Sequence, residues 1–318
     1  MKIRNILVII AFLLAWGQLS AFQIVLQQDS LAPKKPDTVC FKYKFNIGDK
    51  LIFLAMSHDS ITINYGKPLL RSRQEVIEIT CDSIGKTGNF FLKQKLVAYK
   101  AFESSGSEKN VERTTSTWLN REIMYEVDSV GNRYSFRFDD SLKAGMCPGG
   151  AFNPYLLFPF KVDCKAIDES WNVSSMDILP ENGNPLPLLR QSSLFRARKP
   201  IDTLGYFCKR IEYIKTAQGS YELPVDKKKI TVNSIVNGYG TLDISDSLLI
   251  PVHMYSTSEE KLYLIFDDDN QQNGWHFINT DWVLKDYQKG NGAKLKQKPA
   301  NNKKHLPTRL TKKSKKRR

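Results

Sequence analysis

The strongest constraint on the fold is an alternation of apolar and polar residues with a period of two. It is clearest at 41–47, where Phe, Tyr, Phe and Ile alternate with Lys, Lys and Asn. In an extended strand this spacing places the four apolar side chains on one face. We therefore predict a half-buried strand here.

Similar runs separated by Gly, Pro, Asn and Asp predict many further short strands, while helical spacing of apolar residues is scarce. Three runs of the form Asp-Ser/Thr-aliphatic-Gly, at 82–85, 128–131 and 202–205, predict tight turns. We expect a mainly β fold, either an antiparallel sandwich or an open half-barrel built from two β-meander halves. The proline-containing stretch 179–187 is predicted to be a loop. The polar, Ser-rich stretch 101–115 is predicted to be a mobile loop, with the polar ends of two strands within it as the alternative.

A stretch rich in Gly, Pro and aromatic residues, 145–164, separates the two series of strands. It is too irregular for a strand and too apolar for a solvated loop, so we interpret it as a connector around which both halves pack. The expected layout is a signal peptide at 1–21, an extended lead-in at 22–39, a first β half at 40–143, the connector at 144–165, a second β half at 166–285 and a disordered basic tail at 286–318.

The first residues have the pattern of a secretory signal. Lys2 and Arg4 precede the apolar run Ile6–Trp16, and Ala21 offers a small residue for cleavage. Eleven apolar residues cover about half of a ~30 Å hydrocarbon core, so a retained anchor is the weaker alternative. We expect an exported protein of the periplasm, outer surface or extracellular space, with no transmembrane segment after cleavage.

The net charge of +14 is concentrated at the C-terminus. Residues 286–318 hold thirteen Lys and Arg against one Asp, and Lys2 and Arg4 account for the remainder, so the body of the chain is close to neutral. The tail contains no aromatic residue beyond Tyr287 to stack on bases, and we expect no specific nucleic-acid recognition. Its predicted partner is an anionic surface polymer, bound by the terminal cluster Lys312, Lys313, Lys315, Lys316, Arg317 and Arg318.

Five cysteines in an exported chain allow disulfides, and their odd number leaves at least one unpaired within the chain. Cys147 and Cys164 bracket one irregular loop, which makes them the candidate pair. Closing this loop would contribute about 3 kcal/mol in the chain-entropy model. The alternative is that the cysteines are buried thiols.

Catalytic and metal-binding patterns are weak. Ser57-His58-Asp59 has the residue types of a triad, but neighbouring residues cannot adopt its geometry, so we interpret it as a strand end. The oxygen-rich run 267–274 lacks the Gly and Glu of a calcium loop. We therefore expect no enzyme activity, no cofactor and no metal, with a hydrolase of unknown class as an alternative.

The aromatic residues are the best candidates for a ligand site. Most aromatic side chains in a β protein of this size form core, but those of the connector lie in a stretch that Gly and Pro keep irregular. An apolar loop at the mouth of a curved sheet is a common way to form a pocket. The predicted ligand-binding residues are Phe152, Tyr155, Phe158, Phe160 and Trp171.

Two stretches, Tyr43–Leu51 and Ile167–Trp171, resemble uncharacterised secreted β-rich proteins of the bacterial envelope, of the lipid-carrier-like half-barrel type. The resemblance implies a half-barrel sheet that cups a lipid or lipopeptide. We therefore predict an exported, non-enzymatic envelope protein that is structural or binds an apolar, lipid-like ligand between its two β halves. The alternative is a surface protein that binds polyanions through its tail.

Overall fold

The computed structural model describes residues 37–116, 119–138, 156–161, 164–181, 184–225, 228–266 and 270–292. These residues form fourteen strands and contain no helix. The strands are β1 Thr38–Cys40, β2 Lys50–Ile63, β3 Leu69–Ile84, β4 Phe90–Ser105, β5 Glu108–Arg113, β6 Glu122–Val127, β7 Arg133–Phe138, β8 Cys164–Ala166, β9 Ser170–Glu181, β10 Asn184–Thr203, β11 Tyr206–Val225, β12 Lys228–Ser245, β13 Pro251–Ile265 and β14 Gln271–Gln288.

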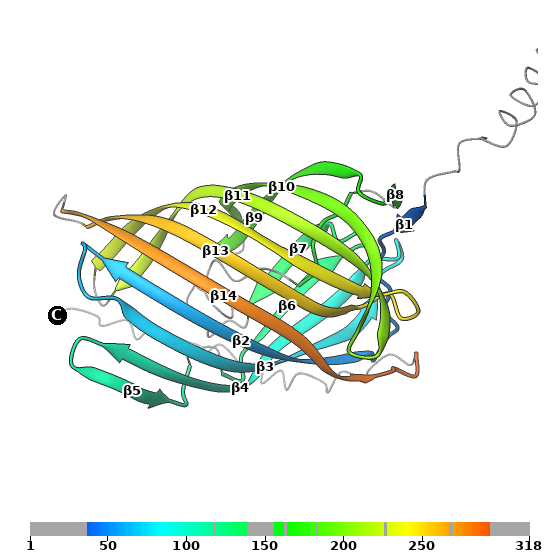
Figure 1. Ribbon diagram of the computed structural model, residues 1–318, viewed down its shortest axis with the longest axis horizontal. Coiled ribbons are helices and arrows are strands. Elements are labelled where there is room, and N and C mark those ends of the chain that lie inside the picture. The colour runs from blue at the N-terminus through cyan, green and yellow to red at the C-terminus, as the bar shows by residue number, and fades with distance from the viewer. Residues whose placement is uncertain are drawn as a thin grey trace, which may run out of the picture.

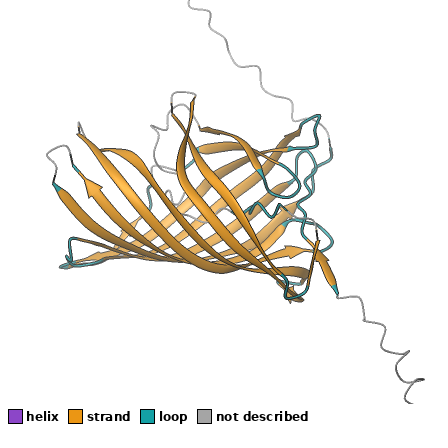
Figure 2. Cartoon of the chain, turned by 90° about the horizontal axis from the view of Figure 1, so that it is seen from above, coloured by secondary structure: helices purple, strands orange, loops and turns teal. Residues whose placement is uncertain are grey.

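Twelve strands form one antiparallel sheet in the order β7-β6-β4-β3-β2-β14-β13-β12-β11-β10-β9, with β5 paired to β4. The strands curve around a common interior, and the small β1–β8 sheet lies at one end, which we call the β1 end (Figures 1 and 2). The two meanders, β2–β7 and β9–β14, meet where β14 pairs with β2. Within the described ranges β7 and β9 are edges that do not pair with each other. The prediction of an open, mainly β meander fold is confirmed.

The segment 41–47 is not the strand that its alternation predicted. Its three aromatic side chains are buried on one side, as expected, but its backbone crosses the β1 end of the sheet without joining it. Tyr43 N donates to Ser129 O at 2.7 Å and Lys44 N donates to Leu249 O at 3.0 Å. Because turns of both meanders accept these hydrogen bonds, the segment ties the two halves together.

The hydrophobic core fills the interior at the β1 end. Each long strand contributes the inward-facing residues of the half that lies near this end, and the segments 41–45 and 156–160 pack between them. The buried rings of this core are Phe41, Tyr43, Phe45, Phe53, Phe90, Tyr125, Phe158, Phe160, Trp171, Phe195, Tyr213 and Trp282.

The loop predicted at 179–187 is wrong: β9 continues to Glu181 and β10 begins at Asn184. Proline is tolerated because this part of the sheet is an edge. Pro180 lies in the outermost strand, and β10 pairs with β11 only from Leu189 onward, so Pro185 faces a single partner strand. A strand with one free side need not donate every N–H to a ladder.

Two further sequence expectations need correction. The polar stretch 101–115 is not a mobile loop; it follows the alternative expectation of polar strand ends, because it contains the end of β4 and all of β5. Cross-strand ion pairs, including Arg113 Nε with Glu103 Oε2 at 3.2 Å, hold this exposed hairpin. The basic tail also starts later than 286. β14 runs to Gln288, and Gly290 N then donates to Asp49 Oδ1 at 2.7 Å.

Candidate functional site: the polar belt of the inner face

The inner face of the sheet changes character along the strands. Beyond the aromatic core, most of the next inward positions are polar and nevertheless buried, with the apolar Ala217, Val236 and Ile278 among them. We call this band the polar belt. It consists of Ser57, Asp59, Arg73, Glu75, Ser193, Lys215, Ser234, Ser256, Ser258, Glu260 and Thr280.

One part of the belt is an ion-pair network on β2 and β3. Asp59 is 4% exposed and accepts from Arg71 Nε at 2.8 Å and from Arg73 Nη2 at 3.2 Å. Arg73 Nη1 also lies 3.5 Å from Glu75 Oε1. Burial raises the pKa of Glu75, and no hydrogen-bond partner for its Oε2 is found among the described residues. Both guanidinium groups are therefore committed to carboxylates of this chain.

The other part lies on β11–β14 and is less completely paired. Ser234 Oγ donates to Glu260 Oε1 at 2.6 Å. His276 Nδ1 lies 3.4 Å from Glu260 Oε2, and burial raises the pKa of Glu260. Within the described part of the chain, Ser258 Oγ, Glu260 Oε2 and His276 Nε2 have no hydrogen-bond partner. Such buried groups are uncommon in folded proteins and call for an explanation.

Two glycines of β12 leave space for side chains of the neighbouring strands β11 and β13. A Cβ on Gly238 would lie 2.9 Å from Ser258 Oγ and 3.1 Å from Lys215 Cε. A Cβ on Gly240 would lie 2.6 Å from Tyr213 OH and 2.1 Å from Tyr255 O. The missing side chains thus let Lys215 of β11 lean across β12 toward Ser258, and Tyr213 toward Ser256.

Farther from the β1 end, the inner face is apolar again. On β13, Leu262 and Leu264 are the next two inward residues after Glu260. On the neighbouring strands, Ile63 packs over Gly274, and a Cβ added to Gly274 would lie 2.7 Å from Ile63 Cδ1. These side chains are half-buried, except for buried Val232, and they lie outside the main core. We call this set the distal apolar patch: Ile61, Ile63, Leu69, Val232, Leu262 and Leu264.

Three of the predicted ligand-binding residues lie in the core. Phe158 packs on Tyr213 with ring centroids 4.6 Å apart, and Phe160 packs on Tyr43 at 5.2 Å. Trp171 Nε1 donates to Phe160 O at 3.0 Å. These rings pack against other core residues and fill the interior of the sheet at the β1 end. Ligand binding by this group stays a prediction, and Phe152 and Tyr155 lie outside the described residues.

The predicted disulfide is wrong. Cys164 is bonded to Cys40, 124 positions away, and the two residues also pair in register between β1 and β8. The prediction assumed that the shortest loop would be closed, whereas the fold brings the lead-in strand beside the end of the connector. Cys81 and Cys208 are free and buried, and Cys147 lies outside the described ranges. A disulfide is consistent with an oxidising, extracytoplasmic location.

The terminal cluster Lys312, Lys313, Lys315, Lys316, Arg317 and Arg318 also lies outside the described residues. Its role in polyanion binding stays a prediction, as does the absence of enzyme activity. In the described ranges, no group of three or more His, Cys, Asp or Glu is arranged to hold a metal ion. No helix in these ranges is long and apolar enough to cross a membrane.

The polar belt was not predicted from the sequence, although the polar residues of β2 give one indication of it. Ser57-His58-Asp59 was interpreted as a strand end, but it lies inside β2. Ser57 and Asp59 face inward and are buried, while the exposed His58 faces outward, with Nδ1 3.0 Å from Ser72 Oγ. Polar residues at inward positions of a strand that begins with Leu51, Phe53 and Ala55 were the available signal.

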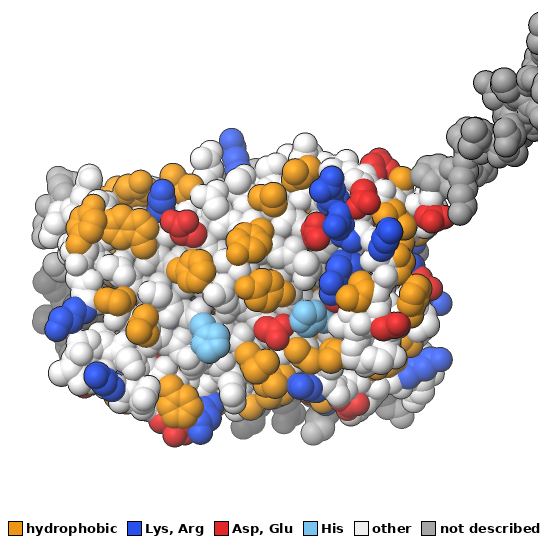
Figure 3. Space-filling model, viewed as in Figure 1, with side chains coloured by type: hydrophobic (Ala, Val, Ile, Leu, Met, Phe, Trp, Pro, Cys, Tyr) orange, Lys and Arg blue, Asp and Glu red, His pale blue; other side chains and the backbone are white. Residues whose placement is uncertain are grey.

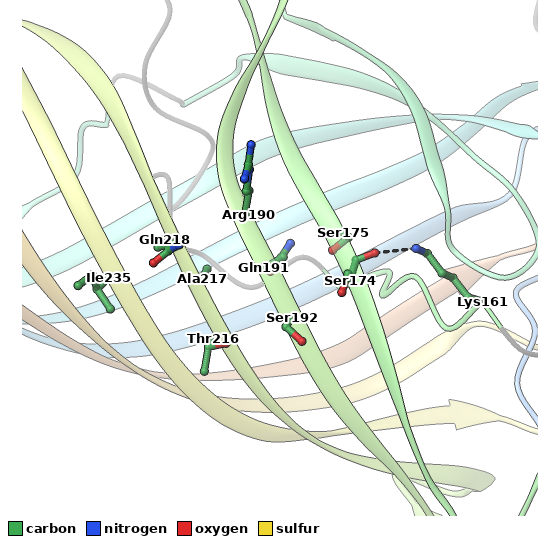
Figure 4. Close-up of a pocket in the computed structure, with 10 residues that line it drawn as sticks. All are labelled: Lys161, Ser174, Ser175, Arg190, Gln191, Ser192, Thr216, Ala217, Gln218 and Ile235. Carbon is green, nitrogen blue, oxygen red and sulfur yellow. Dashed lines mark hydrogen bonds between the residues drawn. The ribbon is translucent and has the colours of Figure 1, made fainter.

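The outer face differs from the inner face. Exposed apolar side chains lie on it among polar and charged ones (Figure 3). Leu194, Ile214 and Tyr239 are cross-strand neighbours on β10, β11 and β12. A shallow groove of about 810 Å³ along β9–β12 is lined mainly by exposed polar residues, and Lys161 Nζ donates to Ser174 O at 2.6 Å beside it (Figure 4). We assign no ligand to this groove.

No protein-family model matches the chain, and no curated protein matches its sequence. The fold is similar to a solved structure of lipovitellin, from work on its lipid–protein interactions, with a TM-score of 0.45 and 12% sequence identity. The match covers 79% of this chain and 26% of the lipovitellin chain, so this chain spans about a quarter of that protein. A likeness at this level carries no argument about function.

Proposed function

We propose that this chain is an exported, non-enzymatic envelope protein that holds an amphipathic, lipid-like ligand against the inner face of its sheet. The observation that carries the proposal is the order of side chains along that face. The aromatic core is followed by the polar belt and then by the distal apolar patch. A molecule with a polar head and an apolar tail matches the last two zones.

The distal apolar patch is the proposed contact for the tail. Its side chains come from strands that are neighbours in the sheet, and Leu262 and Ile63 flank Gly274 in register. Covering half-buried apolar side chains contributes roughly 25 cal/mol for each Å² removed from water. The sheet can present such a surface because its edges β7 and β9 remain unpaired with each other in the described ranges.

The polar belt is the proposed contact for the head. Its buried, incompletely paired groups on β13 and β14 lie directly next to the patch, since Glu260 and Leu262 are successive inward positions of one strand. Leaving a buried polar group unpaired costs about 1–3 kcal/mol. A ligand head that pairs with such groups would offset this cost.

The test is lipid uptake by purified protein, measured by native mass spectrometry after incubation with an envelope lipid extract. We expect the wild type to retain lipid and the double variant Leu262→Ser/Leu264→Ser to lose at least tenfold in occupancy. The matched control is Tyr263→Ser, which changes the outward side chain between them, 44% exposed, and should leave occupancy unchanged. No uptake by the wild type, or equal loss in the control, would contradict the proposal.

A further inference from the structure

The least completely paired part of the inner face is a cluster on β13 and β14 formed by Ser258, Glu260 and His276, with Lys215 of β11 beside it. Ser258 and Glu260 are each 2% exposed and are alternate residues of β13, so both face the interior. His276 is the direct cross-strand partner of Glu260, and Lys215 reaches toward Ser258 over Gly238. Three strands, β11, β13 and β14, thus direct polar side chains to one place, and Gly238 of β12 leaves the space between them.

The unpaired atoms define the chemistry of a partner. A serine hydroxyl donates and accepts, a carboxylate oxygen accepts, and an imidazole nitrogen does either according to its tautomer. Ser258 Oγ and His276 Nε2 have no hydrogen-bond partner among the described residues, and Glu260 Oε2 has only the 3.4 Å contact with His276 Nδ1. These three atoms therefore call for groups that can both donate and accept hydrogen bonds. Hydroxyl groups satisfy all three atoms.

The charges of the cluster disfavour an ionised partner. A phosphate or carboxylate head would only accept hydrogen bonds and would lie beside the buried Glu260, where repulsion between like charges is poorly screened. Of the cations that could compensate, Lys215 already interacts electrostatically with Glu260, and Arg71 and Arg73 are bound to Asp59. A cationic head would in turn meet Lys215, which is close enough to Glu260 to affect its titration, and the imidazole of His276.

We infer that the cluster of Ser258, Glu260 and His276 is a subsite for an uncharged head that bears hydroxyl groups, such as the glycerol or sugar head of a lipid. The inference rests on the proposed function and specifies its ligand class. Ser258 and His276 bind the head directly, and Ser234 positions Glu260 by bonding to its other oxygen.

The experiment compares two pure probes with the same acyl chains, a diacylglycerol and a phosphatidic acid, each presented in neutral detergent to the full-length protein. We expect the diacylglycerol to bind at least tenfold more tightly. Ser258→Ala should bring the two affinities to within about threefold of each other. Because the Ser258 hydroxyl is unpaired, this variant should also leave the unfolding midpoint of the ligand-free protein unchanged or raised.

The matched control is Thr257→Val, at the outward neighbour of Ser258 on β13, whose hydroxyl donates to Asn279 Oδ1 at 2.7 Å. It should lower stability and leave the preference between the two probes intact. Equal or tighter binding of phosphatidic acid by the wild type would overturn the inference while leaving the proposed function standing. Failure of both probes and of the lipid extract to bind would contradict the proposed function itself.

Discussion

Cys40 and Cys164 are joined by a disulfide that spans 124 positions of the sequence and lies where β1 pairs with β8. A bond that closes so long a loop removes much conformational freedom from the unfolded chain. In the chain-entropy model its contribution is about 4–5 kcal/mol. The disulfide thus links β1, at the end of the lead-in, covalently to β8, at the end of the connector.

The first prediction concerns this bond. Cys40→Ser should lower the free energy of unfolding by several kcal/mol, measured by denaturant titration. Reductant should lower the midpoint of the wild type toward that of the variant and should leave the variant itself unchanged. Peptide mapping of the oxidised protein should recover Cys40 linked to Cys164. Recovery of Cys147 linked to Cys164 would contradict the structure.

The second prediction concerns Asp243, which is fully buried on the outer side of β12. Burial alone would raise its pKa, but hydrogen bonds from Arg210 at 2.7 Å to each oxygen, and from His253, lower the pKa to about 2. The stabilisation from this carboxylate is therefore present above about pH 4 and is lost as the pH falls toward 2.

Asp243→Asn should accordingly cost about 2 kcal/mol of stability at pH 7. The difference from the wild type should shrink steadily when unfolding is measured between pH 4 and pH 2. Asp246→Asn is the control, because Asp246 is exposed and pairs with Lys209 at the surface. A difference that did not change with pH would show that Asp243 acts through shape rather than charge.

The third prediction concerns His253, whose Nε2 lies 2.6 Å from Asp281 Oδ1 and whose Nδ1 lies 3.4 Å from Asp243 Oδ2. Hydrogen bonding to Asp243, together with that to Asp281, raises the pKa of His253. The stability that the imidazolium contributes is full below about pH 6.5 and is lost as the pH rises through the raised pKa.

We therefore expect His253→Gln to cost more stability at pH 6 than at pH 9, by roughly 1 kcal/mol. Thermal unfolding at the two pH values measures the difference. His58→Gln is the matched control, because His58 faces outward on β2 and contacts Ser72 rather than a carboxylate. An equal loss at both pH values would rule out a charged role for His253.

The fourth prediction concerns Gly131 in the turn between β6 and β7. Its φ is +85°, and a Cβ there would lie 1.9 Å from Phe158 O. Gly131→Ala should destabilise the protein by about 3 kcal/mol. The alanine would strain the backbone at this positive φ, and its Cβ would also displace the 156–160 segment. Gly88→Ala is the control: its φ of +87° is equivalent, but nothing lies within 4 Å. It should cost only about 1 kcal/mol.

The fifth prediction concerns the aromatic core. Phe160 is fully buried and contacts the rings of Phe41, Tyr43 and Phe195. Phe160→Ala should cost about 3–5 kcal/mol in chemical denaturation. Phe207→Ala, at a ring that is 57% exposed, should cost less than 1 kcal/mol. Similar losses at the two sites would be incompatible with a core centred on Phe160.

Local sequence patterns predicted most of the strands and the turns at 128–131 and 202–205, the latter formed by Leu204 and Gly205 between β10 and β11. The run 128–131 forms its turn because Asp128 Oδ1 accepts from the backbone N–H groups of Val130 and Asn132, at 3.0 and 2.9 Å. This interaction depends only on residues within four positions of one another. The alternation at 41–47 likewise predicted which side chains are buried, although not that the segment lacks a strand partner.

Such local patterns could not predict the candidate site. Alternation tells which residues share a face of a strand, but not how a sheet curves or what covers that face. Asp59 and Glu260 look like solvated residues in the sequence and are buried because twelve strands curve around them. Ser57 meets Thr280 only because β2 pairs with β14, which places residues 223 positions apart side by side.

The sequence by itself therefore determined the strand content, most of the inward and outward positions and the tight turn at Asp128, because these follow from interactions between near neighbours. The tertiary structure alone decided the partner of Cys164 and the buried state of the polar belt. It also decided the separation of the distal apolar patch from the main core. These features depend on the order of strands in the sheet, which long-range pairing sets.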